Sequence, residues 1–270
     1  MIKKKFKKKI LSLALRILKS YFHNTDYSIF IFDRVNKEIH PFLWHPRYLP
    51  KKDFQSSTSD TNDWSNFGDL LSYKDSIVFD VGAAIGSTSR LFSKNAKKVY
   101  SFEPNLDNFN VLKDIIHLEK INNIEPHNLA VSNQNSDLTF YNRESHGIHS
   151  LGKHSKGKII NTSKIKTIRL DKFYQNNFQN NEKIGLIKID TEGFEYEVLE
   201  GSENLLKNKT VKCIIFEHSK SLLKTLGKNP NSIFELLEEY GYEVYDYTGN
   251  LFDYKRNNYN KISDFIALIK

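Results

Sequence analysis

Three acidic side chains stand directly after apolar segments, where they could bind a polar ligand or move a proton. Glu103 follows the segment VYSF, and Asp190 and Glu192 follow the segment LIKI. A carboxylate in such a position can hold an ammonium group, orient a hydroxyl group or accept its proton. Alternatively, Thr191 or Glu192 could cap the helix that follows and favour its dipole. The two roles are compatible, so both remain open at the end of this strand.

A glycine turn follows the apolar segment IVFDV. In the sequence DVGAAIG, Gly82 and Gly86 are four residues apart. Small residues there let the backbone approach a ligand, and the helix that follows offers unpaired N–H groups. The turn lacks the G-x-G-x-x-G spacing of dinucleotide-binding folds and the G-K-[ST] of phosphate loops. Taken alone, it is equally well explained as a tight strand-to-helix turn.

The position of Glu103 makes a nucleoside ligand the better explanation. Glu103 lies 23 residues after Asp80. An acid about 20 residues beyond a glycine turn, at the end of the next strand, is placed to accept both ribose hydroxyls of a nucleoside. We therefore favour this role over that of a solvated loop acid.

Histidines occur in two other places that could bear on chemistry. Glu217 and His218 end the apolar segment VKCIIF and supply an acid and a titratable imidazole. His146, His149 and His154 lie in a stretch rich in Gly, Ser and Lys. No helical histidine spacing or adjacent acid there matches a zinc site, so we expect no metal. A solvated loop, or a mobile loop that covers substrate, fits these three residues better.

Strand-like and helix-like segments alternate from residue 76 onward. The strands are expected at 76–81, 99–102, 124–131, 184–189, 211–216, 242–247 and 264–269, with an added one at 137–141. Pro104 is expected in the first turn of a helix, and residues 142–164 are expected to form a loop. Such alternation predicts an α/β fold with a mostly parallel sheet and helices on both faces.

The chain is expected to have three parts. Residues 1–24 are basic and contain KKKFKKK, which accounts for most of the net charge of +8. Residues 25–75 are expected to form a cap or lid, and 76–270 the main domain. The rest of the chain is only mildly basic, which argues against a nucleic-acid-binding surface. No apolar run reaches membrane-spanning length.

The N-terminal segment has two explanations of equal weight. Apolar residues in ILSLALRILKSYF recur at helical spacing, next to the lysine cluster. Residues 1–22 could therefore lie on an anionic membrane surface as a basic amphipathic helix. Alternatively, they form a solvated basic lead into a helix that packs on the domain or on a second subunit.

Six segments together resemble the FkbM family of methyltransferases, which use S-adenosylmethionine. They are DVGAAIG, FEP, NLAVS, IRLDKF, IKIDTEGFEYEVLEG and IIFEH, in that order. The resemblance covers about residues 76–247, and the DxEGxE block followed by VLEG is its most specific part. It implies a class I methyltransferase fold, which is Rossmann-like, with seven strands and an antiparallel final hairpin. It also implies transfer of a methyl group to a hydroxyl oxygen.

The resemblance assigns roles by position. The cofactor-binding positions are Asp80, Gly82, Ala84, Gly86, Glu103, Asn128 and Ala130. The turn would surround the methionine part of the cofactor, the acid at 103 would hold the ribose, and residues 128 and 130 would lie near the adenine. The family usually has Asn where this chain has Ala84, so cofactor affinity is expected to be weaker here.

The candidate catalytic residues are Asp190, Glu192, Glu217 and His218. The resemblance places Asp190 at the reacting centre with Glu192 beside it. Since the sulfonium methyl is already electrophilic, the protein mainly aligns the reacting atoms. A base such as Asp190 or His218 would remove the hydroxyl proton.

The leading hypothesis is therefore an O-methyltransferase that acts on a sugar, a glycan or a related natural product. We expect it to be cytoplasmic, with the basic N-terminus as the part that would contact the membrane face. The alternatives are a nicotinamide-dependent oxidoreductase, against which the missing G-x-G-x-x-G counts, and a protein that binds S-adenosylmethionine without turnover. The sequence does not indicate an oligomeric state.

Overall fold

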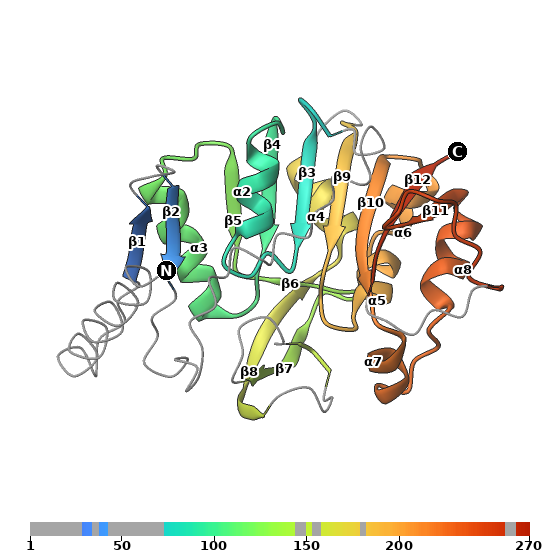
Figure 1. Ribbon diagram of the computed structural model, residues 1–270. Helices are drawn as coiled ribbons and strands as arrows, with labels where there is room; N and C mark the ends of the chain where they lie inside the picture. The colour runs from blue at the N-terminus through green and yellow to red at the C-terminus, as the bar shows by residue number, and fades with distance from the viewer. Residues whose placement is uncertain are drawn as a thin grey trace, which may run out of the picture. The chain divides into compact units, whose positions relative to one another are not determined.

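The computed structural model divides the chain into two compact units, residues 1–55 and 56–270. The first contains an antiparallel hairpin of β1 (Ile29–Asp33) and β2 (Glu38–Phe42). In the second, the structure describes residues 73–143, 150–152, 158–178, 182–256 and 263–270 (Figure 1). The basic segment 1–24, most of the expected cap, and His146, His149 and His154 lie outside the described residues.

A seven-stranded sheet forms the centre of the second unit. Its strands are β3 (Ile77–Val81), β4 (Lys98–Phe102), β5 (Ile124–His127), β9 (Ile184–Ile189), β10 (Val211–His218), β11 (Tyr242–Asp246) and β12 (Ser263–Ile269). Their order is β11-β12-β10-β9-β3-β4-β5. Only β12 runs antiparallel to its neighbours, β10 and β11. This order, with its antiparallel final hairpin, is that of a class I methyltransferase and confirms the predicted fold class.

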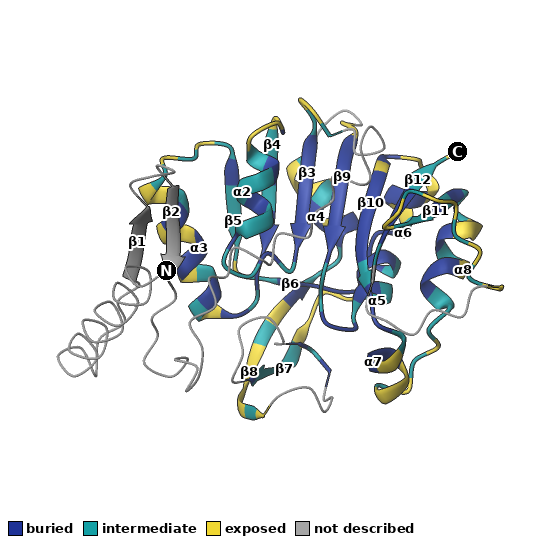
Figure 2. Ribbon diagram, viewed as in Figure 1, coloured by how far each residue is buried: buried dark blue, intermediate teal, exposed yellow. Residues whose placement is uncertain are grey.

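Helices cover both faces of the sheet because alternate strand residues point to opposite sides. They are α2 (Ser87–Ser93), α3 (Leu106–Leu118), α4 (Leu170–Asn177), α5 (Glu195–Glu200), α6 (Glu203–Lys207), α7 (Lys220–Thr225) and α8 (Ser232–Glu239). On one face, Phe79 and Ile187 pack with residues of α4, α5, α6 and α8. On the other face, Val78 and Leu186 pack with Phe92 of α2. The central strands are accordingly buried along their length (Figure 2).

A smaller sheet joins β6 (Ala130–Val131), β8 (Ile159–Ile168) and β7 (Asp137–Arg143) in that order. The expected loop at 142–164 is therefore wrong for its last part, since residues 159–164 belong to β8. Most residues of β8 are exposed, so the strand lacks the apolar alternation by which a half-buried strand is recognised. Pairing with β7 in an antiparallel ladder forms it instead.

Helix α3 begins later than predicted. Its N-cap is Asn105, whose side chain accepts a hydrogen bond from the backbone N–H of Asn108. Pro104 therefore lies before the helix and not in its first turn. The Asn105 side chain fixes the start because it satisfies one of the N–H groups that have no partner in a first turn.

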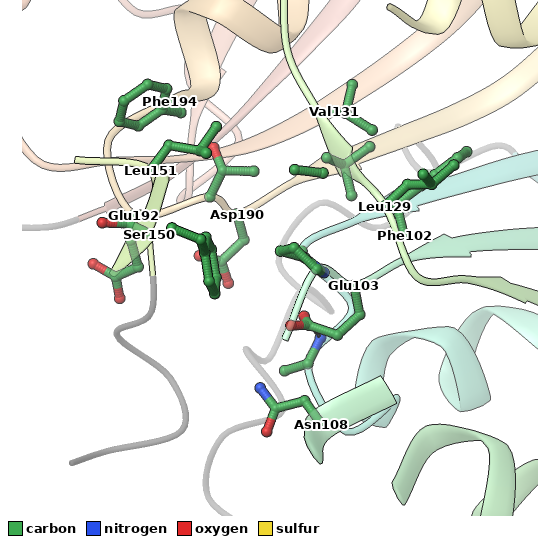
Figure 3. Close-up of a pocket in the computed structure, with 17 residues that line it drawn as sticks. Phe102, Glu103, Asn108, Leu129, Val131, Ser150, Leu151, Asp190, Glu192 and Phe194 are labelled. Carbon is green, nitrogen blue, oxygen red and sulfur yellow. Dashed lines mark hydrogen bonds between the residues drawn. The ribbon is translucent and has the colours of Figure 1, made fainter. Parts of the chain in front are cut away.

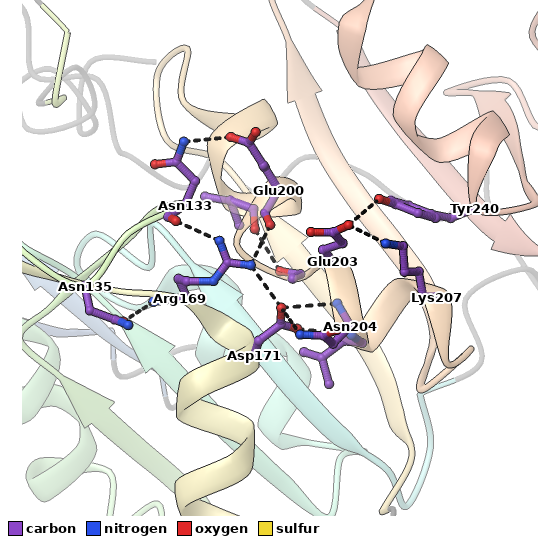
Figure 4. Close-up of polar contacts among 12 residues, drawn as sticks. Asn133, Asn135, Arg169, Asp171, Glu200, Glu203, Asn204, Lys207 and Tyr240 are labelled. Carbon is purple, nitrogen blue, oxygen red and sulfur yellow. Dashed lines mark hydrogen bonds and ion pairs between the residues drawn. The ribbon is translucent and has the colours of Figure 1, made fainter.

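Asp171 joins α4 to α6 (Figure 4). It is buried, and its two carboxylate oxygens accept bonds from the backbone N–H groups of Asn204 and Leu205, 3.1 Å each. The guanidinium of Arg169 donates to the same carboxylate at 3.2 Å. Helix α6 has no side-chain cap of its own at Ser202. Asp171 therefore caps this helix from a different element.

Candidate active site

The main pocket lies at the carboxyl ends of β3, β4 and β9, where α/β sheets bind their ligands. Its lining combines apolar and acidic groups from these ends with residues of the smaller sheet (Figure 3). The lining residues are Val81, Gly82, Ala84, Phe102, Glu103, Pro104, Asn108, Leu129, Ala130, Val131, Phe140, Ser150, Leu151, Asp190, Thr191, Glu192 and Phe194. Glu103 enters from one side, and Asp190 and Glu192 from the other.

Glu103 is fixed at the end of β4 by two backbone groups. Its Oε2 accepts from the N–H of Ala84 and its Oε1 from the N–H of Asn105, both at 2.8 Å. Burial raises the pKa of the carboxyl to about 7, although these two hydrogen bonds, a third from the Asn108 side chain and the charge of Lys188 favour the charged form. A carboxylate offers about four lone-pair positions, so it can still accept a hydrogen bond from a ligand.

The glycine turn places its backbone close to other elements. Gly82 and Ala84 line the pocket and have positive φ angles of 77° and 47°. A Cβ on Gly82 would stand 1.8 Å from the carbonyl oxygen of Asp190, and one on Gly86 2.4 Å from the Leu112 side chain. Gly86 does not line the pocket. Its role is to let helix α2 start against α3, which sets the shape of the turn.

The segment after β9 is held in an unusual backbone conformation. Glu192 and Gly193 both have positive φ angles, 55° and 96°. The Oε1 atom of Glu195 accepts from the N–H of Thr191 at 2.9 Å and from the N–H of Gly193 at 3.1 Å. A non-glycine residue in the left-handed region costs about 1–3 kcal/mol and persists only where the surrounding structure holds it. As a result, Glu192 and Asp190 both present carboxylates to one pocket.

Asp190 is the most accessible of the pocket acids. Its side chain is 36% exposed, whereas Glu103 and Glu192 are both buried. Its Oδ2 atom lies 3.4 Å from Nζ of Lys188. A partly solvated carboxylate that lines a pocket can contact a bound molecule and accept a proton from it.

Lys188 was missed in the sequence analysis. It is 4% exposed near the carboxyl end of β9, with its Nζ 3.1 Å from the carbonyl oxygen of Gly82 and 3.6 Å from Oδ1 of Asp80. The signal was present, because a lysine inside a buried strand is rare unless it is paired.

Arg143 is a second residue that the sequence analysis missed. It is fully buried at the end of β7, and it donates to the hydroxyl of Ser150 at 3.3 Å and to the carbonyl of Gly152 at 2.8 Å. Burial lowers its pKa, and the charge of Glu192 acts in the opposite direction. Arg143 thus supports the wall formed by residues 150–152. Its position in the sequence carries no signal that would have revealed it.

Asp80 and Asn128, two of the expected cofactor residues, do not line the pocket but bond to the segments that surround it. Asp80 is fully buried, and its Oδ2 accepts from the hydroxyls of Thr88 at 2.7 Å and Ser89 at 2.5 Å. Asn128 donates from Nδ2 to the carbonyls of Glu103 and Pro104. Neither Asp80 nor Asn128 lines the pocket, whereas Ala130 does.

Glu217 and His218 lie elsewhere. His218 lines a second cavity of about 310 Å³, together with Glu197 and Lys228, and neither Glu217 nor His218 is among the residues of the main pocket. Burial lowers the pKa of His218 to about 4, and its Nε2 bonds the carbonyl of Pro230 at 2.8 Å. The structure therefore brings Asp190 and Glu192 together but not these two residues.

The lining of the main pocket has the chemistry that a nucleoside needs. Leu129, Val131 and Phe140 could form an apolar wall for a base, and Glu103 could accept hydrogen bonds from ribose hydroxyls. Across the described residues, no group of three or more His, Cys, Asp and Glu side chains could hold a metal ion. The described helices include none long and apolar enough to cross a membrane.

Comparisons with known proteins agree with this geometry. The methyltransferase FkbM domain matches residues 80–244, more than half of the chain. Hexuronic acid methyltransferase AglP of Haloferax volcanii is 30% identical over 167 residues. The match covers 62% of this chain and 63% of AglP, so the chain spans less than two thirds of that relative.

Two solved structures are similar at low identity. One is methyltransferase FkbM from Methylobacillus flagellatus, with a TM-score of 0.48 and 13% identity, covering 76% of this chain and 47% of that one. The other is SMU.1697c of Streptococcus mutans in complex with S-adenosylhomocysteine (SAH), with a TM-score of 0.44 and 10% identity, covering 76% and 93%. On the strength of the domain match, the chain belongs to the FkbM family of methyltransferases, and its methyl donor is S-adenosylmethionine.

Proposed function

We propose that this methyltransferase transfers the methyl group to a hydroxyl oxygen of a sugar, a glycan or a related natural product. The observation that carries the proposal is the Asp190 carboxylate, which is 36% exposed and lines the same pocket as Glu103. A hydroxyl acceptor loses a proton as it is methylated, so its methylation benefits from a base in this position. The relative AglP, a hexuronic acid methyltransferase, supports a sugar as the acceptor class.

When bound, S-adenosylmethionine supplies a methyl group that its sulfonium already makes electrophilic. The residues of the chain then have three tasks, which are to hold donor and acceptor in line, to exclude water and to take the proton. We assign the proton to Asp190. Glu192, on the same side of the pocket, would orient the acceptor.

The cofactor would be held at the glycine turn and the end of β4. Glu103 would accept the ribose hydroxyls, Gly82 and Ala84 would border the methionine part, and Ala130 would lie against the adenine. Asp80, Gly86 and Asn128 would contribute through the backbone that they position. Involvement of Glu217 or His218 in the reaction stays a prediction, as do a cytoplasmic location and membrane contact through residues 1–22.

The proposal is tested with a panel of acceptors and labelled S-adenosylmethionine. The panel pairs neutral hexosides with the corresponding hexuronosides, and mass spectrometry locates the added methyl group on a hydroxyl or a carboxyl oxygen. A methyl ether on a sugar hydroxyl supports the proposal. A methyl ester on a hexuronic acid would contradict it, because an ionised carboxylate needs no base.

The remaining alternative is a protein that binds the cofactor without turnover. SAH binding by calorimetry, combined with no methylation of any acceptor in the panel, would favour it. Methylation of a sugar at a rate that falls in Asp190→Asn would exclude it and assign the base.

A further inference from the structure

We infer that Lys188 is a positioning residue for methyl transfer, which fixes the Asp190 carboxylate in the pocket and joins it to the cofactor turn at Gly82. The inference goes beyond the proposed function because Lys188 would contact neither the cofactor nor the acceptor. The part of its test that measures turnover rests on the proposed function.

Lys188 needs a reason to lie where it does. It is on β9 between β3 and β10, at 4% exposure, and it does not line the main pocket. Burial of an ammonium group is strongly unfavourable unless it is paired and hydrogen-bonded. An apolar side chain would fill the same space in the sheet without that cost. A lysine here therefore indicates a task that an apolar residue cannot perform.

Asp80 alone could balance the charge of Lys188. Its Oδ1 atom lies 3.6 Å from Nζ and has no hydrogen-bond donor among the described residues, while its Oδ2 accepts from two hydroxyls of α2. One ammonium and one carboxylate would already be neutral. The second carboxylate, Asp190 at 3.4 Å, is thus not needed to compensate the buried charge. Its pairing serves to orient the side chain that faces the pocket.

The same ammonium group also holds the glycine turn. Its Nζ donates to the carbonyl oxygen of Gly82 at 3.1 Å. Gly82 lines the pocket, and its Cα hydrogen faces the carbonyl oxygen of Asp190, where a Cβ would stand only 1.8 Å away. The N–H of Asp190 in turn bonds the carbonyl of Val81 at 3.0 Å. The turn and the Asp190 backbone are therefore in direct contact. The Lys188 ammonium group adds a second link, because it contacts both the Asp190 carboxylate and the Gly82 carbonyl.

Lys188 keeps its proton in this arrangement. Burial by itself lowers the pKa of the ammonium, but the charges of Asp190 and Asp80 more than offset this, so the net pKa is raised. A permanently charged lysine can orient groups but cannot serve as a base.

The test is a double-mutant cycle of Lys188→Met and Asp190→Asn, read by SAH calorimetry and by turnover. Lys188→Met should weaken SAH binding about tenfold, through loss of one charged hydrogen bond to the turn. Asp190→Asn should change SAH affinity much less. With an acceptor identified, and at a saturating concentration of S-adenosylmethionine, the turnover of the double variant should be no lower than that of Asp190→Asn alone, because Lys188 acts on the chemical step through Asp190.

Two further variants make the outcome decisive. Lys183→Met removes an exposed lysine just before the same strand and should leave both readouts unchanged. If Lys188→Met does not fold, Asp80→Asn combined with Lys188→Met removes the buried ammonium together with its interior counter-ion. Compared with Asp80→Asn alone, that variant should show the same loss of SAH affinity.

Unchanged SAH affinity on loss of Lys188, or turnover losses that simply add in the double variant, would overturn the inference. Failure of the proposed function would look different. In that case the unaltered protein would methylate no sugar hydroxyl, either because it methylates nothing or because it forms only a methyl ester, while SAH calorimetry would still report on Lys188.

Discussion

The Asp190 and Glu103 carboxylates line the same pocket, but they differ in hydrogen bonding and in exposure, which suits them to different roles. Glu103 accepts two backbone N–H groups and is 4% exposed, which fixes its direction. Asp190 is 36% exposed and is held by a side chain, Lys188, from beneath. A fixed acceptor suits recognition of a cofactor, whereas an accessible carboxylate suits contact with the reacting hydroxyl.

Asp190→Asn is therefore expected to separate turnover from cofactor binding. The amide cannot accept the hydroxyl proton, so turnover should fall about 100-fold or more. SAH affinity should change little, because the ribose and adenine contacts lie at other residues. Calorimetry with SAH and single-turnover kinetics measure the two quantities. Equal losses in both would make Asp190 a binding or structural residue.

Glu103 should make cofactor binding depend on pH. Its pKa of about 7 means that much of the carboxyl is neutral below neutrality in the free protein. Ribose hydroxyls donate to the charged form, so binding lowers the pKa and releases a proton at low pH. Affinity for SAH should thus rise about tenfold from pH 6 to pH 8 and then level off, by proton linkage.

Glu103→Gln is the matched control for this pH dependence. It keeps one acceptor oxygen and removes the titration, so affinity should be weaker and nearly constant over the same range. Calorimetry in buffers of different ionisation enthalpy would also count the released proton. An equal rise with pH in Glu103→Gln would show that another group is responsible.

At the scale of elements, the turn between β3 and α2 holds Ala84 in a backbone conformation that alanine disfavours. Its φ of 47° lies in the left-handed region, which alanine disfavours by about 1–2 kcal/mol and asparagine tolerates. Ala84→Asn should raise the free energy of unfolding by about 1 kcal/mol on this account. Ala84→Val should lower it, because a β-branched residue fits this region worst. Urea unfolding of both variants measures the two free energies of unfolding. A change in the same direction for Ala84→Asn and Ala84→Val would contradict the explanation.

The Asp171 side chain of α4 caps the first turn of α6 and so links the two helices. Asp171→Ala would leave the N–H groups of Asn204 and Leu205 without their acceptor, at a cost of about 3 kcal/mol of unfolding free energy. SAH affinity should not change, since Asp171 does not line the pocket. Lys207→Ala, which breaks an exposed pair with Glu203, should lower the unfolding free energy much less. Similar losses in both variants would argue against the cap.

The elements that sequence could predict are those whose residues are buried. The central strands are continuous apolar runs, and the glycine turn and the acids at the strand ends identify the edge where the pocket lies. Strand β8 was missed because it is largely exposed and depends on pairing with β7. Arg143 was missed for a related reason, since its partners Ser150 and Gly152 are 7 and 9 residues away in the chain. Lys188 was missed although a lysine inside an apolar strand is itself a signal; what the sequence does not show is its bond to Gly82, 106 residues away. His218 shows the limit of this reasoning. It lies at the end of a strand, as the pocket acids do, but it lines the second cavity and not the main pocket.

At the scale of the whole molecule, the parts that carry out binding belong to one unit. Every described residue that lines the main pocket lies between Val81 and Phe194, and the buried residues of both core clusters lie between Ile77 and Ala267. All of these fall within the compact unit of residues 56–270.

A chain of residues 56–270 is thus expected to fold and to bind SAH as the full chain does. SAH at 100 times its Kd should stabilise either form by about 2.7 kcal/mol, which corresponds to a rise in Tm of about 5–10 °C for a domain of this size. NADH should raise neither Tm, because the turn lacks dinucleotide spacing. Calorimetry and thermal unfolding of the two forms provide the comparison. Folding without SAH binding in the shorter chain would show that residues 1–55 complete the cofactor site, and the acceptor screen would then have to use the full chain alone.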